Sequence, residues 1–396
     1  MPVPVPVPAP DASMRALILL ALAALPLGAP RAAGRCPDGQ HGPAGDWPSA
    51  AEEVRKARPA EVAALDAYAF TLAGDEAARR GIRTDGLVVV HRGVVTYERY
   101  GRGFGPATPH LAWSVTKSLT QALAGVAVAR GALSLDDSIC AHLAGVDAGR
   151  CAITVRNLLD SASGLDWTET YEGLRLQSSS VLAMLYGEGR RDMVRFALSH
   201  ELRAQPGARW TYSSGDSVVL AAVVDAAMRK AGAGPDWPFE ALLAPLGITS
   251  ATVERDAAGT LVGCSYLYAT PRDLARLGWL FLQDGCWQRR PLLPEGWVRV
   301  ATEPSAAYRT PGGRRDRAQG SHGWWLWLNR PVPEVGIGTS WPGAPEDAYA
   351  ARGHWGQNVV VIPSLELVIV RTADDRERAL DLGRLVALAV AAGRLP

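Results

Sequence analysis

Two residues with catalytic potential lie in the stretch "LAWSVTKSLTQALAG", residues 111–125, where Lys117 follows Ser114 by three positions. The stretch is predicted to open a helix, and residues i and i+3 share one helix face, so the amine can reach the hydroxyl. A serine hydroxyl becomes a good nucleophile only when a base takes its proton. A lysine amine can do this if burial or nearby positive charge lowers its pKa. The spacing therefore predicts a serine nucleophile with a lysine base.

Lysine is rare in this chain, which makes Lys117 more informative. Lysine accounts for only three of the 41 basic residues, Lys56, Lys117 and Lys230, and the others are arginine. Arginine cannot act as a base because it stays protonated in proteins. The alternative interpretation is a chance match, with "TKS" forming a solvated turn at a helix start. As the first residue of a helix, Ser114 would also have free N–H groups nearby to hold an oxyanion.

Two further segments carry suitable side chains. "WTYSSGDS" places Tyr212 just before a predicted helix, where its hydroxyl could relay a proton; the alternative is an aromatic residue that packs at the helix start. "RGHWGQNVVV" places His354, Trp355 and Gly356 immediately before a predicted strand. A glycine there allows a substrate to approach the backbone, and the next N–H, that of Gln357, can point into a cleft.

The order "SVTK", "YSS" and "HWG" resembles the three motifs S-x-x-K, Y-x-N and K-T-G of the serine β-lactamase and penicillin-binding-protein superfamily. The similarity is greatest to its class C-type branch, which includes esterases, D-amino-acid peptidases and 6-aminohexanoate-dimer hydrolases. It extends over about residues 60–395, and "GALSLDDSI", "ITVRNLLDSASGLDW", "QPGARWTYSS" and "ATPRDLARLGWLFLQDG" support it.

The resemblance implies a role for each residue. Ser114 would be the acylated nucleophile, Lys117 its base, and Tyr212 the group that protonates the leaving group and then activates water. The backbone N–H groups of Ser114 and Gln357 would form the oxyanion hole, with residues 354–356 at the edge of the cleft. The family uses no metal or organic cofactor. The implied fold is an α/β (α+β) fold, in which an antiparallel sheet flanked by helices carries an inserted, mainly helical domain.

The motifs depart from those of β-lactamases at positions that contact the substrate. Ser214 replaces the asparagine that holds the acyl side chain, and His354 and Trp355 replace the lysine and threonine that help to bind the carboxylate. These departures favour a linear amide or ester as substrate. In "DWTETY", Glu169 or Tyr171 is expected to line the cleft, with Tyr171 closing over substrate; the alternative is that both are ordinary loop residues.

Composition and missing motifs exclude several other classes. A net charge of +1 argues against a nucleic-acid partner or a membrane surface. The chain has no G-x-S-x-G elbow of α/β-hydrolases, and its seven histidines include no helical pair that could hold zinc. The tryptophans of "HGWWLWLN" are interpreted as strand and core residues; the alternative is that one of them reaches the substrate. The predicted partner is thus a small amide or ester.

Strand patterns lie at both ends of the chain, and helical patterns lie between them. "GLVVVHRGVVTYERYG" predicts a hairpin, and "HGWWLWLN" and "NVVVIPSLELVIV" predict further strands. "TPRDLARLGWLFLQDG" is the best-marked helix, with Thr270 as its N-cap. Residues 59–113 and 262–396 are expected to form one sheet domain and 114–261 a helical domain, with the site in the cleft between them. Residues 35–58 are expected to form an irregular arm.

The N-terminus is typical of an export signal. After a Pro-rich start, Met14 opens a conventional pattern: Arg15, the apolar run "ALILLALAALPLG", and small residues ending at Gly34. The apolar run is too short for a membrane span. We expect Met14 to be the true start, residues 1–34 to be a signal peptide cleaved near Ala33 or Gly34, and the mature protein to be periplasmic or secreted. The alternative is a buried N-terminal helix.

Cysteine spacing fits an oxidising compartment. Local pairing would join Cys140 to Cys151 and Cys264 to Cys286, and would leave Cys36 over. Buried free thiols are the alternative.

Two alternative functions remain open. One is another enzyme, a β-lactamase or D,D-peptidase acting on cell-wall-type substrates, and the other is a non-hydrolytic ligand sensor. The presence of Ser114, Lys117 and Tyr212 together disfavours the sensor.

Overall fold

The computed structural model describes residue 36 and residues 42–73, 76–172, 175–313 and 320–395. Its centre is a seven-stranded antiparallel sheet with the strand order β2-β1-β12-β11-β10-β9-β8. The strands of this sheet are β1 (Thr84–His91), β2 (Val94–Tyr100), β8 (Ser321–His322), β9 (Trp327–Leu328), β10 (Tyr349–Gly353), β11 (Gln357–Ile362) and β12 (Leu367–Ala373). The predicted signal segment, residues 1–34, lies outside the described residues.

Short strands and helices make up the rest of the described chain. The minor strands are β3 (His110–Leu111), β4 (Thr252–Val253), β5 (Leu267–Ala269), β6 (Cys286–Trp287) and β7 (Arg290–Pro291). The α-helices are α1 (Ala51–Ala57), α2 (Pro59–Ala69), α3 (Val115–Ala129), α4 (Val155–Leu159), α5 (Ser180–Tyr186), α6 (Met193–Leu198), α7 (Ser214–Lys230), α8 (Pro271–Leu282), α9 (Trp297–Ala301), α10 (Ala306–Arg309) and α11 (Leu382–Gly393). No helix of the described segments combines the length and the apolar character that a membrane crossing requires.

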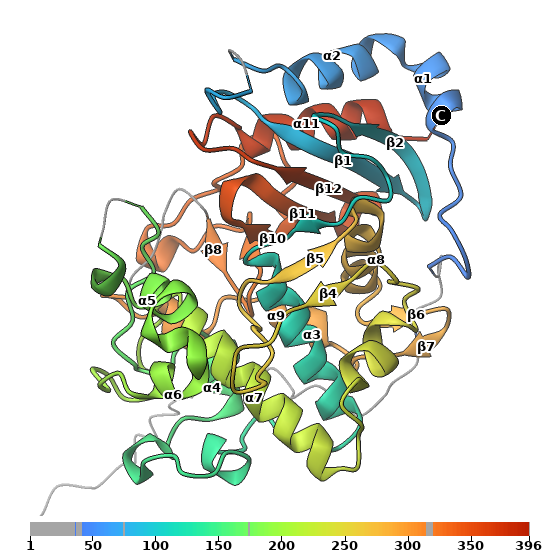
Figure 1. The fold of residues 1–396 in the computed structure, drawn as a ribbon. Coiled ribbons are helices and arrows are strands. Elements are labelled where there is room, and N and C mark those ends of the chain that lie inside the picture. The colour runs from blue at the N-terminus through green and yellow to red at the C-terminus, as the bar shows by residue number, and fades with distance from the viewer. Residues whose placement is uncertain (1–35, 37–41, 74–75, 173–174, 314–319, 396) are drawn as a thin grey trace, which may run out of the picture.

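Both faces of the sheet are buried, which explains its nearly continuous apolar strands. Along β1, Val88 and Val90 join the core formed with α3, α7 and α8, whereas Leu87 and Val89 join the core formed with α2 and α11. Figure 1 shows α2 and α11 side by side above the sheet, on the face that carries the second core. Gly278 of α8 contributes to the close packing, since a Cβ there would lie 2.7 Å from a methyl group of Val368.

The predicted fold class is confirmed. The sheet takes its strands from both ends of the chain, and helices α3–α7 come between them in sequence; α4–α7 lie beyond one end of the sheet in Figure 1. The predicted β1–β2 hairpin forms, with Arg92 and Gly93 at positive φ in its turn. Helix α8 also begins as predicted, because the Thr270 side chain accepts a hydrogen bond from the Asp273 amide.

Three local predictions were wrong in extent. The segment expected to be an irregular arm contains α1, whose Val54 is fully buried. The pattern of "TVRNLLDSASG" predicts a helix that ends at Gly164, but α4 ends at Leu159, because Ser161 takes a positive φ of 53° that a helix cannot continue through. "HGWWLWLN" is not one strand but a tight hairpin of β8 and β9, in which the Gly323 amide donates to the Leu326 carbonyl.

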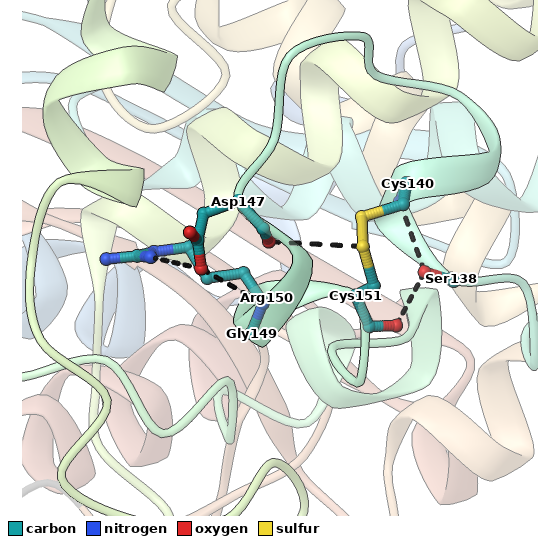
Figure 2. Close-up of a disulfide and its surroundings, with 6 residues drawn as sticks. All are labelled: Ser138, Cys140, Asp147, Gly149, Arg150 and Cys151. Carbon is teal, nitrogen blue, oxygen red and sulfur yellow. Dashed lines mark hydrogen bonds and ion pairs between the residues drawn. A yellow bond between two sulfur atoms is a disulfide. The ribbon is translucent and has the colours of Figure 1, made fainter.

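One predicted disulfide forms and the other does not. Cys140 and Cys151 are bonded, and Figure 2 shows Ser138 beside them, its hydroxyl donating to the Cys151 carbonyl and accepting from the Cys140 amide. The predicted Cys264–Cys286 pair is wrong: Cys286 is bonded to Cys36, and Cys264 is a buried free thiol.

The surroundings of the two cysteines differ. Cys264 lies beside the start of α3, where its carbonyl accepts from Lys117, whereas Cys286 begins β6 on the other side of the 12-residue helix α8 in sequence. Spacing along the chain carried no information about these different places in the fold. Residue 36, the cysteine expected to be left over, supplies the partner instead.

Candidate active site

The start of helix α3 is held by a small sheet. Strand β3 pairs with β5, and the Ala112 amide donates to the Leu267 carbonyl at 2.8 Å. Thr116 fixes the turn that leads from β3 into α3, since its hydroxyl donates to the Trp113 carbonyl and accepts from the Leu267 amide. Trp113 has a positive φ of 48°, a strained backbone state for a large side chain, immediately before Ser114. Ser114 is thereby placed as the N-cap of α3, half-exposed.

Lys117 lies one turn further along α3 and is almost fully buried. Its side chain is 1% exposed, and its Nζ donates to Ser114 Oγ at 2.9 Å and to the Cys264 carbonyl at 3.0 Å. The predicted reach of the amine across i and i+3 is therefore present. The free cysteine contributes through its backbone carbonyl, which orients the amine toward the serine.

The protonation of Lys117 depends on opposing effects. Burial lowers the pKa of the amine, but the neighbouring Tyr212 and Glu169 raise it, and the net direction is upward. Burial also raises the pKa of the Tyr212 phenol, although Lys117 and a hydrogen bond with Ser114 oppose this. Both pKa shifts favour a lysine ammonium beside a neutral tyrosine at pH 7 in the free protein, a protonation state that the sequence alone left open.

Tyr212 is fixed by an aromatic cage. Its ring stacks on Trp327 with centroids 5.5 Å apart and planes 17° apart, and His322 and Trp325 contact it edge to face. Lys117 Nζ lies 5.0 Å from the centre of the same ring. The phenol consequently approaches Ser114 and Lys117 from one defined direction, and the structure brings Ser114, Lys117 and Tyr212 together.

The end of strand β10 passes very close to the start of α3. A Cβ on Gly353 would lie 2.3 Å from the Ala112 carbonyl oxygen, so only glycine allows this approach. Beyond it, the Gln357 side chain donates to the His354 and Ala373 carbonyls and accepts from the Ala373 amide, which fixes the backbone at the start of β11. The amide of Ser114 donates to no described residue, as an oxyanion donor requires.

Residues 354–356 form a short turn at the edge of the cleft. The His354 ring stacks on Tyr171 at 4.8 Å, and burial lowers its pKa to about 4 even though Glu172 lies 3.7 Å away. This histidine is therefore neutral at pH 7. Gly356 has a φ of +91°, and a Cβ there would lie 2.5 Å from the Arg371 guanidinium, so internal packing by itself requires glycine at this position.

These residues surround a cleft with a volume of about 700 Å³. Ser114 lies in its wall, and both aromatic and charged side chains contribute to the lining. The lining residues most relevant to chemistry are Ser114, Glu169, Tyr171, Tyr212, His354, Trp355, Gly356, Trp327, Arg352, Arg376 and Arg378. A cleft of this size suits a small molecule.

The structure separates the remaining predicted residues into two groups. Glu169 and Tyr171 line the cleft, as expected, and the Tyr171 hydroxyl donates to Glu169 Oε1 at 2.6 Å. Ser214 does not line it: the side chain is buried, and its hydroxyl donates to Glu169 Oε1 at 2.5 Å. The residue that replaces the β-lactamase asparagine thus contacts the protein's own carboxylate.

Two aromatic residues in the site were not among the candidates. Trp113 contacts the rings of His354 and Trp355, and Trp327 carries the stacking face for Tyr212 and lines the cleft. Trp113 stands directly before the predicted nucleophile, which is a signal the sequence did offer. The strand pattern gave no means of telling Trp327 from its buried neighbours Trp324 and Trp325.

Comparison with known proteins shows which family the chain belongs to. The sequence model of the Beta-lactamase family matches residues 63–392. The chain belongs to the β-lactamase family. It is also 27% identical over 338 residues to a 6-aminohexanoate-dimer hydrolase of Paenarthrobacter ureafaciens, which covers 82% of this chain and 81% of that protein. As a member of this family, the chain is a serine hydrolase.

Solved structures of the family share the fold. A penicillin-binding-protein homologue from Caulobacter crescentus superposes with a TM-score of 0.59 at 17% identity, covering 91% of this chain and 99% of that one. EstCE1, a hydrolase with promiscuous acyltransferase activity, gives a TM-score of 0.60 at 16% identity, covering 86% and 100%. Within the described segments of the present β-lactamase-family chain, no three His, Cys, Asp or Glu side chains gather as a metal site would need.

Proposed function

We propose that the protein is an exported serine hydrolase that cleaves a small linear amide or ester through an acyl-enzyme on Ser114. The observation that carries the proposal is the 2.9 Å contact between Lys117 Nζ and Ser114 Oγ in the wall of the cleft. The similarity to a 6-aminohexanoate-dimer hydrolase supports a linear amide.

In the proposed reaction, Lys117 and Tyr212 act as one base. In the free protein both Lys117 and Tyr212 carry a proton, and loss of one of these protons leaves either a neutral amine or a phenolate. Either form accepts the Ser114 proton as Oγ bonds to the substrate carbonyl carbon. The backbone N–H groups of Ser114 and Gln357 hold the oxygen that becomes negative.

The second half of the reaction returns the proton. The pair protonates the leaving amine or alcohol as its bond to the carbonyl carbon breaks, which leaves an ester on Ser114. The same pair then takes a proton from water, the hydroxide attacks the ester carbon, and Ser114 recovers its proton as the carboxylic acid departs.

The departures from β-lactamases support a linear substrate. Ser214 is buried and donates to Glu169, so it offers no group to hold an acyl side chain. His354 brings no positive charge at pH 7, because burial lowers its pKa to about 4. The two contacts that recognise a β-lactam in the motifs of the family therefore have no equivalent at these positions.

Export is supported by the cysteines. Two disulfides among the described residues suit an oxidising compartment, periplasmic or extracellular. N-terminal sequencing of the protein recovered outside the cytoplasm tests this part: a mature start after Ala33 or Gly34 supports a cleaved signal, and retention of Met14 contradicts it.

The hydrolase is tested with a fluorophosphonate probe and a p-nitrophenyl ester. Wild-type protein is expected to be labelled and to turn over the ester, while Ser114→Ala and Lys117→Ala lose turnover by at least about 10²-fold. Undiminished labelling of Ser114→Ala would contradict the assignment. A 6-aminohexanoate dimer and nitrocefin run in parallel separate a linear amide from a β-lactam. A stable wild-type protein that turns over none of the substrates and does not react with the probe points to a non-hydrolytic sensor.

A further inference from the structure

Glu169 is held by four donors. Its Oε2 accepts from the Trp167 indole N–H at 2.5 Å and from the Ser214 amide at 2.9 Å. Its Oε1 accepts from the hydroxyls of Tyr171 at 2.6 Å and Ser214 at 2.5 Å. The carboxylate side chain is only 10% exposed. Four donors therefore fix the position of this buried carboxylate.

This fixed carboxylate faces the proposed base. Glu169 Oε1 lies 4.0 Å from Lys117 Nζ, and the lysine side chain is 1% exposed. A buried ammonium is costly unless a negative charge lies close to it. Ser114 Oγ and the Cys264 carbonyl, the two hydrogen-bond partners of the amine, are both uncharged.

Three neighbouring groups, the Tyr212 phenol, the Cys264 thiol and the His322 imidazole, carry no charge at pH 7. Burial raises the pKa of the Tyr212 phenol, and it raises that of the Cys264 thiol to about 12. Burial also lowers the pKa of His322 on β8 to about 3. On α7, burial raises the pKa of Asp216 to about 7, and this side chain is hydrogen-bonded to the hydroxyls of Ser163 and Ser213. Among the described residues, Glu169 is the acidic group in salt-bridge range of Lys117.

We propose that Glu169 is the fixed counter-ion of Lys117, which keeps the amine protonated in the free protein and so sets the pH above which Ser114 is activated. Glu169 is thus a positioning residue that acts through Lys117, not a substrate ligand. The inference rests on the proposed function, in which Lys117 and Tyr212 form the base.

The arrangement also connects the base to the wall of the cleft. The oxygen that faces Lys117 is the one that accepts from Tyr171, whose ring stacks on His354. A carboxylate at this point therefore fixes the charge of the base and the position of a cleft-lining aromatic ring together.

Glu169→Gln removes the charge with little change of shape. The amide oxygen can replace Oε2, which must accept from two N–H groups. The amide nitrogen then replaces Oε1, where both partners are hydroxyls that can rotate to accept instead of donate. All four contacts can survive, so the variant is expected to fold.

Two matched variants isolate the charge. Glu172→Gln removes a carboxylate that also lines the cleft but that approaches His354 at 3.7 Å instead of Lys117. Tyr171→Phe removes a donor to Glu169 and keeps the charge. The acid limb of kcat/KM is expected to move to lower pH by about one unit or more in Glu169→Gln. In both controls it should stay within a few tenths of a unit.

The charge of Lys117 can be measured without activity. The chain has only three lysines, so protein labelled with ¹³C at lysine Cε gives three NMR signals, and Lys117→Arg identifies the one of interest. Lys117 is expected to be protonated at pH 7 in the wild type and to lose its proton at lower pH in Glu169→Gln. A neutral Lys117 at pH 7 in the wild type, or an unchanged titration in Glu169→Gln, would overturn the proposal.

The NMR titration of Lys117 and the pH dependence of kcat/KM together distinguish failure of the counter-ion role from failure of the proposed function. If the signal shifts as expected but the protein hydrolyses nothing, the counter-ion role stands and the proposed function fails. If the protein is active through Ser114 but neither the signal nor the acid limb moves, the proposed function stands and the role of Glu169 fails.

Discussion

At the scale of residues, we propose that Ser114, Lys117 and Tyr212 act as one titrating unit rather than as a nucleophile with a separate base. The amine donates to the serine oxygen, and the phenol interacts with both side chains. The sequence predicted the residues and their contact. It left the protonation state of the lysine open, because the counter-ion that we propose, Glu169, reaches Lys117 only through the folding of the 167–171 loop against α7.

Removal of the tyrosine hydroxyl should remove proton transfer and leave the fold intact. Tyr212→Phe is expected to lower kcat/KM by about 10²–10⁴-fold. The melting temperature should change by only a few degrees, because the ring keeps its contacts with Trp327 and His322. Steady-state kinetics and thermal melting check both expectations. An unchanged kcat would show that Lys117 acts alone.

His322 should make the protein sensitive to acid. Burial lowers its pKa to about 3 from an ordinary value of 6.5, so between these values only the unfolded chain takes the proton. The free energy of unfolding therefore falls as the pH falls, by about 2 kcal/mol between pH 7 and pH 5 from this residue.

The variant His322→Phe should lack that loss. Asp160 and Asp216, whose pKa values burial raises to about 6 and about 7, act in the opposite direction in both proteins and cancel in the comparison. Urea unfolding at pH 7 and pH 5 measures the difference. Equal losses in the two proteins would mean that the buried imidazole is protonated in the folded state.

At the scale of elements, the site depends on one close crossing between a strand and a helix. Gly353 at the end of β10 packs against the carbonyl of Ala112 just before α3, which brings Gln357 toward Ser114. The sequence predicted a strand after "HWG" and a helix after "SVTK", because each has a local pattern. It gave no sign of the crossing, since a contact between residues about 240 positions apart has no local pattern.

A methyl group at the crossing should separate the two elements. Gly353→Ala places a Cβ 2.3 Å from the Ala112 oxygen, both of them close to rigid backbone. We expect kcat/KM to fall by at least about tenfold, since a 1 Å displacement at a catalytic site can cost about 10²-fold.

A matched glycine provides the control. Gly234 is exposed, and a Cβ there would meet no atom within 4 Å. Gly234→Ala should therefore leave kcat/KM unchanged and alter the free energy of unfolding by less than about 0.5 kcal/mol. If both variants lose activity equally, the close crossing is not what positions the site.

At the scale of the whole molecule, strand patterns at both ends of the chain, with helical patterns between them, were enough to predict a sheet built from both chain ends. Strands β1, β11 and β12 are apolar along most of their length because helices cover both faces. The long-range disulfide was not predictable. Cys36 lies 250 residues from Cys286, and only the path of the N-terminal segment beside α8 and β6 brings them together.

The two disulfides should differ in their contribution to stability. In the chain-entropy description, loss of the short Cys140–Cys151 loop costs about 3 kcal/mol, and loss of the long Cys36–Cys286 loop costs about 5 kcal/mol. Chemical unfolding of Cys36→Ser and Cys140→Ser compares them, with the larger loss expected for Cys36→Ser.

Mapping of non-reduced peptides is the direct check on connectivity. It should find Cys36 joined to Cys286 and an alkylatable thiol at Cys264 only after denaturation. A peptide that joins Cys264 to Cys286 would contradict the structure.

The same long loop has a consequence for biosynthesis. At about 5–20 residues per second, Cys286 emerges roughly 12–50 s after Cys36. During this interval Cys140 and Cys151 appear, and oxidation in order of appearance would join Cys36 to Cys140 and produce a misbridged chain. Correct assembly therefore requires either delayed oxidation of Cys36 or an enzyme that reshuffles disulfides. The yield of this protein in a given host is thus governed by the thiol-exchange capacity of the compartment as well as by the stability of the fold.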